Sequence, residues 1–151
     1  MYEKLVKGAI LRHFQETEVL INQLTDESLT QEPVSSGRPL GEIILHIIRS
    51  FEFYSQGLAK DNWKPLTYDL KTYSSAKKMK GLFQQVVEKV KGYLNLIQSN
   101  SLNDSVTGFN REATKIEILL EMLEHSIQHR GQILVYYRLL GIEPEKIPYI
   151  V

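Results

Sequence analysis

The chain has 151 residues, 42% hydrophobic and 24% charged, which are ordinary values for a globular protein and suit one domain spanning residues 1–151. Its 18 basic and 18 acidic residues cancel, so the composition indicates neither a nucleic-acid partner nor attraction to an anionic membrane. The absence of cysteine excludes disulfides, thiolate ligands and a cysteine nucleophile, and no segment is apolar enough to span a bilayer, so we expect a cytoplasmic protein.

The first predicted helix spans about residues 2–24, where apolar side chains repeat at three- and four-residue spacing. Its inward row consists of Val6, Ile10, Thr17, Leu20 or Ile21, and Leu24. His13 lies on this row near the midpoint of the helix. Residues 25–39, which are rich in Thr, Ser, Gly and Pro, are predicted to form a connecting loop.

The second predicted helix begins at Pro39, because proline favours the first helical position, and continues to about residue 59. Its two neighbouring inward rows are Leu40, Ile44, Ile47, Phe51, Tyr54 and Leu58, and Ile43, His46, Ser50 and Phe53. His46 is therefore an inward-facing histidine some two turns inside this helix. Residues 61–72, with Trp63 and Pro65, form a second irregular connection.

The third predicted helix covers about residues 75–98, with Ser74 or Ser75 as its N-cap. Its inward face consists of Met79, Leu82 or Phe83, Val86, Val90, Leu94 and Ile97, and it carries no histidine. This region is the most basic in the chain, and a solvated face is favoured over a phosphate-binding one. Residues 100–113 are predicted as a polar loop that could include a short extended piece around 105–109.

The fourth predicted helix runs from Thr114 to Gly141. Thr114 and Glu117 form a capping box at its start, and Gly141 suits the left-handed position just past its end. Two apolar rows follow the helix: Ile116, Leu120, Leu123, Ile127, Leu134 and Tyr137 in one, and Ile118, Met122, Ile133, Tyr136 and Leu140 in the other. The last ten residues are expected to lie along the surface or to contribute to a subunit contact.

Four long helical patterns without a convincing strand predict an all-α protein, a four-helix bundle with long connecting loops. In such bundles, metal and ligand sites are built in the core from side chains on facing helices. The second apolar row of the last helix is interrupted by His125 and His129, which lie one turn apart on one face. This spacing allows both imidazoles to bind one metal ion, although buried histidines are also common as hydrogen-bonded core residues.

The inward His46 adds a third candidate ligand and strengthens the metal interpretation. Three imidazoles are the protein ligands of an open catalytic site, which leaves a position for water or a substrate atom. A zinc protease is excluded, because Ser126 stands where the general base of an HExxH motif would be. Glu42 and Glu121 could support the ligand histidines, but both are more often plain surface charges.

Two further polar residues are candidates for the same site. His13 is interpreted as a fourth ligand, a polar group near the open position, or simply a core histidine. Gln132, three residues after His129, could bond to a ligand histidine or a bound water, or could be a residue at the boundary of the core. No catalytic residue is assigned from the sequence.

The second helix carries His46, and the last helix carries an HxxxHRGQ signature formed by His125, His129, Arg130, Gly131 and Gln132. Through these features, nearly the whole chain resembles the DinB-like or YfiT-like superfamily of damage-inducible metalloproteins. The resemblance implies a four-helix bundle of unusual connectivity, commonly dimeric. It also implies that His46, His125 and His129 hold a divalent metal, usually zinc or nickel. Relatives with known chemistry include bacillithiol transferases and mycothiol-dependent isomerases.

The expected function is therefore that of a metal-dependent enzyme, such as a low-molecular-weight-thiol S-transferase or a hydrolase, in stress response or detoxification. Its partners would be a small-molecule thiol and an electrophilic substrate, with no nucleic acid and no membrane. The alternative is a non-catalytic, metal-stabilised stress or binding protein. A homodimer is expected from the resemblance and from aromatic residues left over by the helix patterns, including Trp63 and Tyr149.

Overall fold

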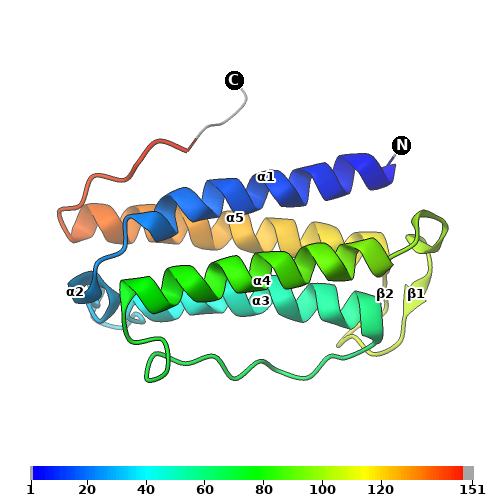
Figure 1. Ribbon diagram of the computed structural model, residues 1–151, viewed down its shortest axis with the longest axis horizontal. Coiled ribbons are helices and arrows are strands. Elements are labelled where there is room, and N and C mark those ends of the chain that lie inside the picture. Colours follow the sequence, from blue (N-terminus) through cyan, green and yellow to red (C-terminus); the bar gives the residue numbers. More distant parts are fainter. Residues whose placement is uncertain (1, 148–151) are drawn as a thin grey trace.

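The computed structural model describes residues 2–147, with side chains from residue 4 onward, and shows an all-α fold as predicted (Figure 1). Four long helices form a bundle, joined by a short helix, one turn of 3-10 helix and a two-stranded ribbon. In chain order the elements are α1 (Tyr2–Asn22), α2 (Asp26–Leu29), α3 (Leu40–Lys60), α4 (Ala76–Leu96), η1 (Ser99–Ser101), β1 (Ser105–Val106), β2 (Ala113–Thr114) and α5 (Lys115–Leu139).

The four long helices are arranged so that each packs against two neighbours. Helices α1 and α3 lie across the bundle from each other, and each contacts both α4 and α5. Helices α1 and α5 run in one direction, whereas α3 and α4 run in the opposite one (Figure 1). The connection between α3 and α4 must therefore return along the length of the bundle, which explains the long irregular segment after α3.

The predicted ends of the helices are largely confirmed. The Thr114 hydroxyl accepts a hydrogen bond from the Glu117 N–H, and the Glu117 carboxylate accepts one from the Thr114 N–H at 2.7 Å, which completes the capping box of α5. Gly141 follows α5 with a φ of 72°, in the left-handed region that suits glycine. Ser75, rather than Ser74, caps α4, and Pro39 is the N-cap of α3 rather than its first helical residue.

The small elements between the long helices lie mostly in segments predicted as loops. Helix α2 begins at a capping box formed by Thr25 and Ser28, and buries Leu29. The Asp26 carboxylate then accepts a hydrogen bond from the Ala76 N–H at 2.7 Å, which ties α2 to the start of α4. Strands β1 and β2 pair antiparallel with Ser105 opposite Thr114, so the extended piece expected near residue 105 is present.

The inward faces of the helices form one continuous core, as their spacing predicted. Every position predicted to face inward from α4 and its C-cap is buried: Met79, Leu82, Phe83, Val86, Val90, Leu94 and Ile97. On α5, however, Leu120 and Ile127 of the first apolar row are exposed, because the long helices that chiefly cover α5 are α1 and α3, which leave its outer side open. No helix within residues 2–147 is long and apolar enough to cross a membrane.

Candidate metal centre

Three histidines from two facing helices converge in the bundle. His46 comes from α3, and His125 and His129 come from successive turns of α5. His125 Nε2 lies 3.0 Å from His46 Nε2 and 3.2 Å from His129 Nε2. One nitrogen of each ring lies within 4.8 Å of the corresponding atoms of the other two. The structure thus brings together the three residues that the sequence analysis singled out as ligands.

Hydrogen bonds between the rings cannot satisfy this cluster. A neutral imidazole nitrogen carries either one hydrogen or one lone pair, so His125 Nε2 can complete one linear hydrogen bond and not two. The other nitrogen of this ring, His125 Nδ1, is buried without a hydrogen-bond partner. Because a cation shared by the three Nε2 atoms would use lone pairs that now face one another, the donor set fits an imidazole-bound divalent metal.

Gln132 determines which nitrogen of His129 carries the proton. Its side-chain oxygen, Oε1, lies 2.9 Å from His129 Nδ1. Since an amide oxygen only accepts hydrogen bonds, Nδ1 must be the donor, and the lone pair of the neutral ring is then on Nε2. This lone pair is directed toward the other two histidines, as metal ligation requires.

Burial keeps two of the clustered histidines neutral. Desolvation, with a smaller contribution from the charge of His129, lowers the pKa of both His46 and His125 from 6.5 to about 4. The guanidinium of Arg38 acts on His46 in the same direction. Both imidazoles are therefore unprotonated at neutral pH, the state in which they can act as ligands.

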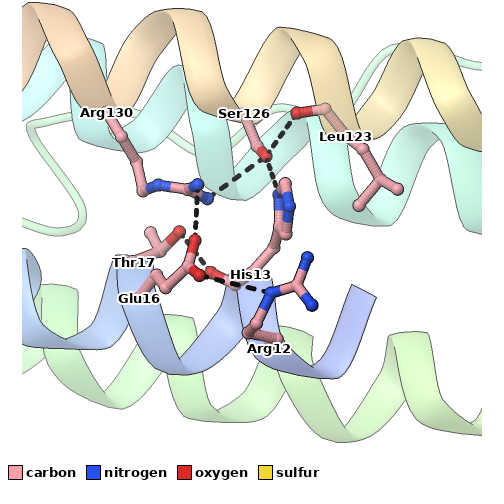
Figure 2. A network of polar contacts seen from close by, with 7 residues as sticks. All are labelled: Arg12, His13, Glu16, Thr17, Leu123, Ser126 and Arg130. Atoms are coloured by element: carbon pink, nitrogen blue, oxygen red, sulfur yellow. Dashed lines mark hydrogen bonds and ion pairs between the residues drawn. The ribbon is translucent and has the colours of Figure 1, made fainter. Parts of the chain in front are cut away.

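His13 belongs to a separate polar network between α1 and α5 (Figure 2). Its Nδ1 lies 2.9 Å from the Ser126 hydroxyl, which itself donates to the Leu123 carbonyl at 2.8 Å. The hydroxyl proton is thereby used, so His13 Nδ1 must donate to Ser126 Oγ. Burial, followed by the charges of Arg130 and Arg12, lowers the pKa of His13 to about 4. His13 is not among the side chains that converge at the histidine cluster.

The same network contains an ion pair that the sequence analysis missed. Arg130 Nη2 donates to Glu16 Oε2 at 2.6 Å, and both side chains are 4% exposed or less. Arg12 lies on the outer side of the same carboxylate, with its Nε 3.4 Å from Glu16 Oε1 (Figure 2). The sequence did contain a signal for this pair. Arg130 lies one turn after Ser126, among the inward residues of α5, and the acidic Glu16 lies beside the inward row of α1.

The two glutamates considered as supports for the ligands bond elsewhere. Glu42 forms an ion pair with Arg49, and Glu121 forms one with Arg111. The second carboxylate oxygen of Glu121 accepts from the Tyr54 hydroxyl at 3.2 Å. The charge of Glu121 nevertheless opposes the lowering of the His125 pKa, so this carboxylate is close enough to act on the cluster electrostatically.

A pocket of about 420 Å³ gives access to the cluster at His46 and His129. Its walls come from the loop before α3, from α3 and from α5. The lining residues are Ser36, Gly37, Arg38, Ile43, His46, Gln128, His129 and Gln132. His46 and His129 are thus reachable by a small molecule, which is a property that an open catalytic metal site would need.

Comparison with known proteins links this arrangement to one family. A sequence profile of the DinB family matches residues 1–150. Bacillus subtilis (strain 168) YjoA is 24% identical over 134 residues, covering 87% of this chain and 86% of YjoA. YrdA from the same organism is 25% identical over 127 residues, covering 83% of this chain and 75% of YrdA.

Solved structures show the same fold. A DinB-like protein from Bacillus cereus ATCC 10987 superposes with a TM-score of 0.81 at 23% identity, covering 100% of both chains. The crystal structure of YjoA gives a TM-score of 0.78 at 22% identity and covers 96% of both chains. A conserved protein from Enterococcus faecalis gives 0.68 at 16% identity, covering 91% of this chain and 96% of its own.

Proposed function

Starting from the fact that the chain belongs to the DinB family, we propose that it binds a divalent metal ion and acts as a metal-dependent enzyme. The reaction class that we favour is S-transfer from a low-molecular-weight thiol to an electrophile, in stress response or detoxification. The observation that carries this proposal is the convergence of three Nε2 atoms beside an open pocket.

His46, His125 and His129 would hold the ion, and zinc or nickel suits such an imidazole set. A divalent ion at this position would allow a small thiol to bind as its thiolate at neutral pH. Because the chain has no cysteine, the reacting sulfur has to come from a small molecule. Gln132 keeps His129 in the tautomer whose lone pair faces the site, and burial keeps His46 and His125 unprotonated.

The proposed reaction balances without an oxidant or reductant. The thiol sulfur forms a bond to an electrophilic carbon of the second substrate, and the bond from that carbon to its leaving group breaks. The thiol proton is released to solvent. The pocket in front of His46 and His129 supplies the space in which both molecules can meet.

Elemental analysis of protein purified without a histidine tag, followed by a turnover assay, tests this function. We expect one metal equivalent per chain and metal-dependent conjugation of bacillithiol to an alkylating fluorophore. His129→Ala should abolish turnover, whereas Glu124→Ala, an exposed position on the same helix, should leave it unchanged. Stoichiometric metal without turnover would support the alternative of a non-catalytic metal-stabilised protein, and turnover that survives His129→Ala would contradict the proposed site.

We further propose a homodimer, formed through the outer face of α5. Four large apolar side chains on this helix are between 45% and 56% exposed: Leu120, Ile127, Val135 and Leu139. Of the two aromatic residues named as left over by the helix patterns, only Trp63 can be placed, and it packs within its own chain. Trp63 packs against Phe53, Phe109 and the backbone at Gly57 and Gly108, and Tyr149 lies outside the described residues.

A further inference from the structure

The pocket at the histidine cluster carries an uncompensated positive charge. Of the residues that line it, Arg38 alone has a permanently charged side chain, and no acidic residue is among them. Arg38 is exposed and close enough to His46 for its charge to act on that imidazole. A metal ion held by three neutral histidines would add two further positive charges beside it. The pocket therefore favours an anionic ligand.

Within the described part of the chain, Arg38 has no charge partner, unlike Arg49, the other arginine near His46. Arg49 is ion-paired with Glu42 and donates to the Tyr68 carbonyl at 2.7 Å, so its charge is compensated and two of its donors are used. The side chain of Arg38 forms no hydrogen bond and no ion pair with any side chain of residues 4–147. Its five N–H donors are free to bind a ligand.

The backbone that carries Arg38 is nevertheless held firmly. The Gly37 N–H donates to the Val34 carbonyl at 2.9 Å, which closes a turn just before Arg38. A side chain at Gly37 would collide with the Tyr136 hydroxyl, so the loop approaches α5 closely at this point. On the other side, the Leu40 N–H donates to the Gln31 carbonyl at 3.0 Å. A guanidinium on a fixed backbone is suited to recognition, because ligand binding has to order only the Arg38 side chain and not the loop that carries it.

We infer that this pocket selects a small-molecule substrate with a carboxylate group, and that Arg38 binds this carboxylate. A planar guanidinium matches a carboxylate with two parallel hydrogen bonds, which a neutral analogue cannot form equally well. The side chains of Gln128 and Gln132, from α5, also line the pocket and can bond to polar groups elsewhere in the ligand. This inference rests on the proposed function, in that it names a substrate class for the same site.

Binding of a matched pair of thiols to zinc-loaded protein tests the inference. The probes are 3-mercaptopropionate, which carries a carboxylate, and 3-mercaptopropionamide, which is uncharged, with Kd measured by isothermal titration calorimetry. The wild type should bind the carboxylate about ten- to a hundredfold more tightly, as expected for a hydrogen bond to a charged group. Arg38→Gln should remove this preference while leaving the zinc content unchanged. Arg38→Lys should retain part of it.

Arg138→Gln is the matched control, since Arg138 is likewise exposed but does not line the pocket. It should keep the full preference for the carboxylate. A wild type without preference, or an Arg38→Gln variant that retains it, overturns the inference even when zinc binds normally.

A second experiment tests the anion site when the proposed metal-dependent function fails. If the wild type holds no zinc, the metal-free protein is titrated with succinate and with succinamide by NMR. Succinate-specific shifts of the amides of residues 36–38 and 128–132, lost in Arg38→Gln, would still support the anion site. Equal shifts with both probes, or no shifts, would overturn it.

Discussion

His13 is one of the buried or half-buried histidines whose lowered pKa makes the stability of the fold depend on pH. Its pKa is lowered from 6.5 to about 4 in the folded protein, so the unfolded chain takes up the proton first as the pH falls. Its contribution to stability is complete above pH 6.5 and is lost as the pH falls from 6.5 toward 4. The loss at this one group would be at most about 3 kcal/mol.

We therefore expect His13→Asn, which offers a neutral donor to Ser126, to weaken the dependence of the free energy of unfolding on pH. The measurement is urea denaturation of metal-free protein at several pH values between 4 and 7. The variant should show a shallower slope than the wild type over this range. Equal slopes would mean that His13 is protonated in the folded state or is not the group responsible.

The proposed metal site predicts how single substitutions of its histidines change the effect of metal on Tm. If an ion binds only the folded chain, adding it should raise Tm by mass action. His46→Ala, His125→Ala and His129→Ala should each abolish most of this increase, whereas His13→Asn should keep it. Gln132→Ala should weaken metal affinity by about ten- to a hundredfold, because the partner of a ligand histidine orients its ring.

Differential scanning calorimetry with and without one equivalent of zinc measures these changes. Acid should also release the ion, since protons compete for the ligand nitrogens. If all the single variants keep the full metal-dependent increase in Tm, the ion binds elsewhere and the ligand assignment is wrong.

At the scale of helices, the buried ion pair between Glu16 and Arg130 joins α1 to α5 (Figure 2). The surrounding side chains exclude water, so removing one partner leaves an unpaired charge in the core. We expect Glu16→Ala to lower the free energy of unfolding by about 3–5 kcal/mol. Chemical denaturation at neutral pH provides the measurement.

The chain offers a matched control in the surface pair between Lys91 and Glu88. Glu88→Ala should change the free energy of unfolding by less than about 1 kcal/mol, because water screens that pair. Replacing both buried partners, as in Glu16→Met with Arg130→Met, should restore much of the stability lost in Glu16→Ala. A Glu16→Ala variant as stable as Glu88→Ala would show that the buried pair is not a coupled unit.

At the scale of the whole molecule, the apolar outer face of α5 predicts association. A stable interface buries about 800 Å² of each partner, and one long helix face with a neighbouring helix can supply such an area. Light scattering at micromolar concentration should give twice the chain mass of 17.5 kDa. Ile127→Asp combined with Val135→Asp should give the monomer mass. Leu96→Asp, at an equally exposed apolar position on α4, should leave the dimer intact.

A monomeric wild type at this concentration would contradict the dimer without affecting the metal site. All three histidines of the proposed metal site come from one chain, so the cluster is complete in a single copy.

Local patterns in the sequence determined the helices, most of their inward faces and the pairing of His125 with His129. Apolar periodicity, the Thr114 capping box and Gly141 act within a few residues, so they can be interpreted without knowing the neighbours. An i, i+4 pair likewise shares one helix face whatever lies opposite. The small helix α2 was missed because its four residues are too few for a periodic pattern.

Only the tertiary structure decided which residues face one another across the bundle. His46 meets His125 because α3 packs against α5 with a particular rotation and register, and these depend on all the contacts between the two helices together. His13 had the same inward spacing as His46, yet α1 covers a different flank of α5 and directs it to Ser126. The pairing of Glu16 with Arg130 arises at that same contact, between residues 114 positions apart in the chain.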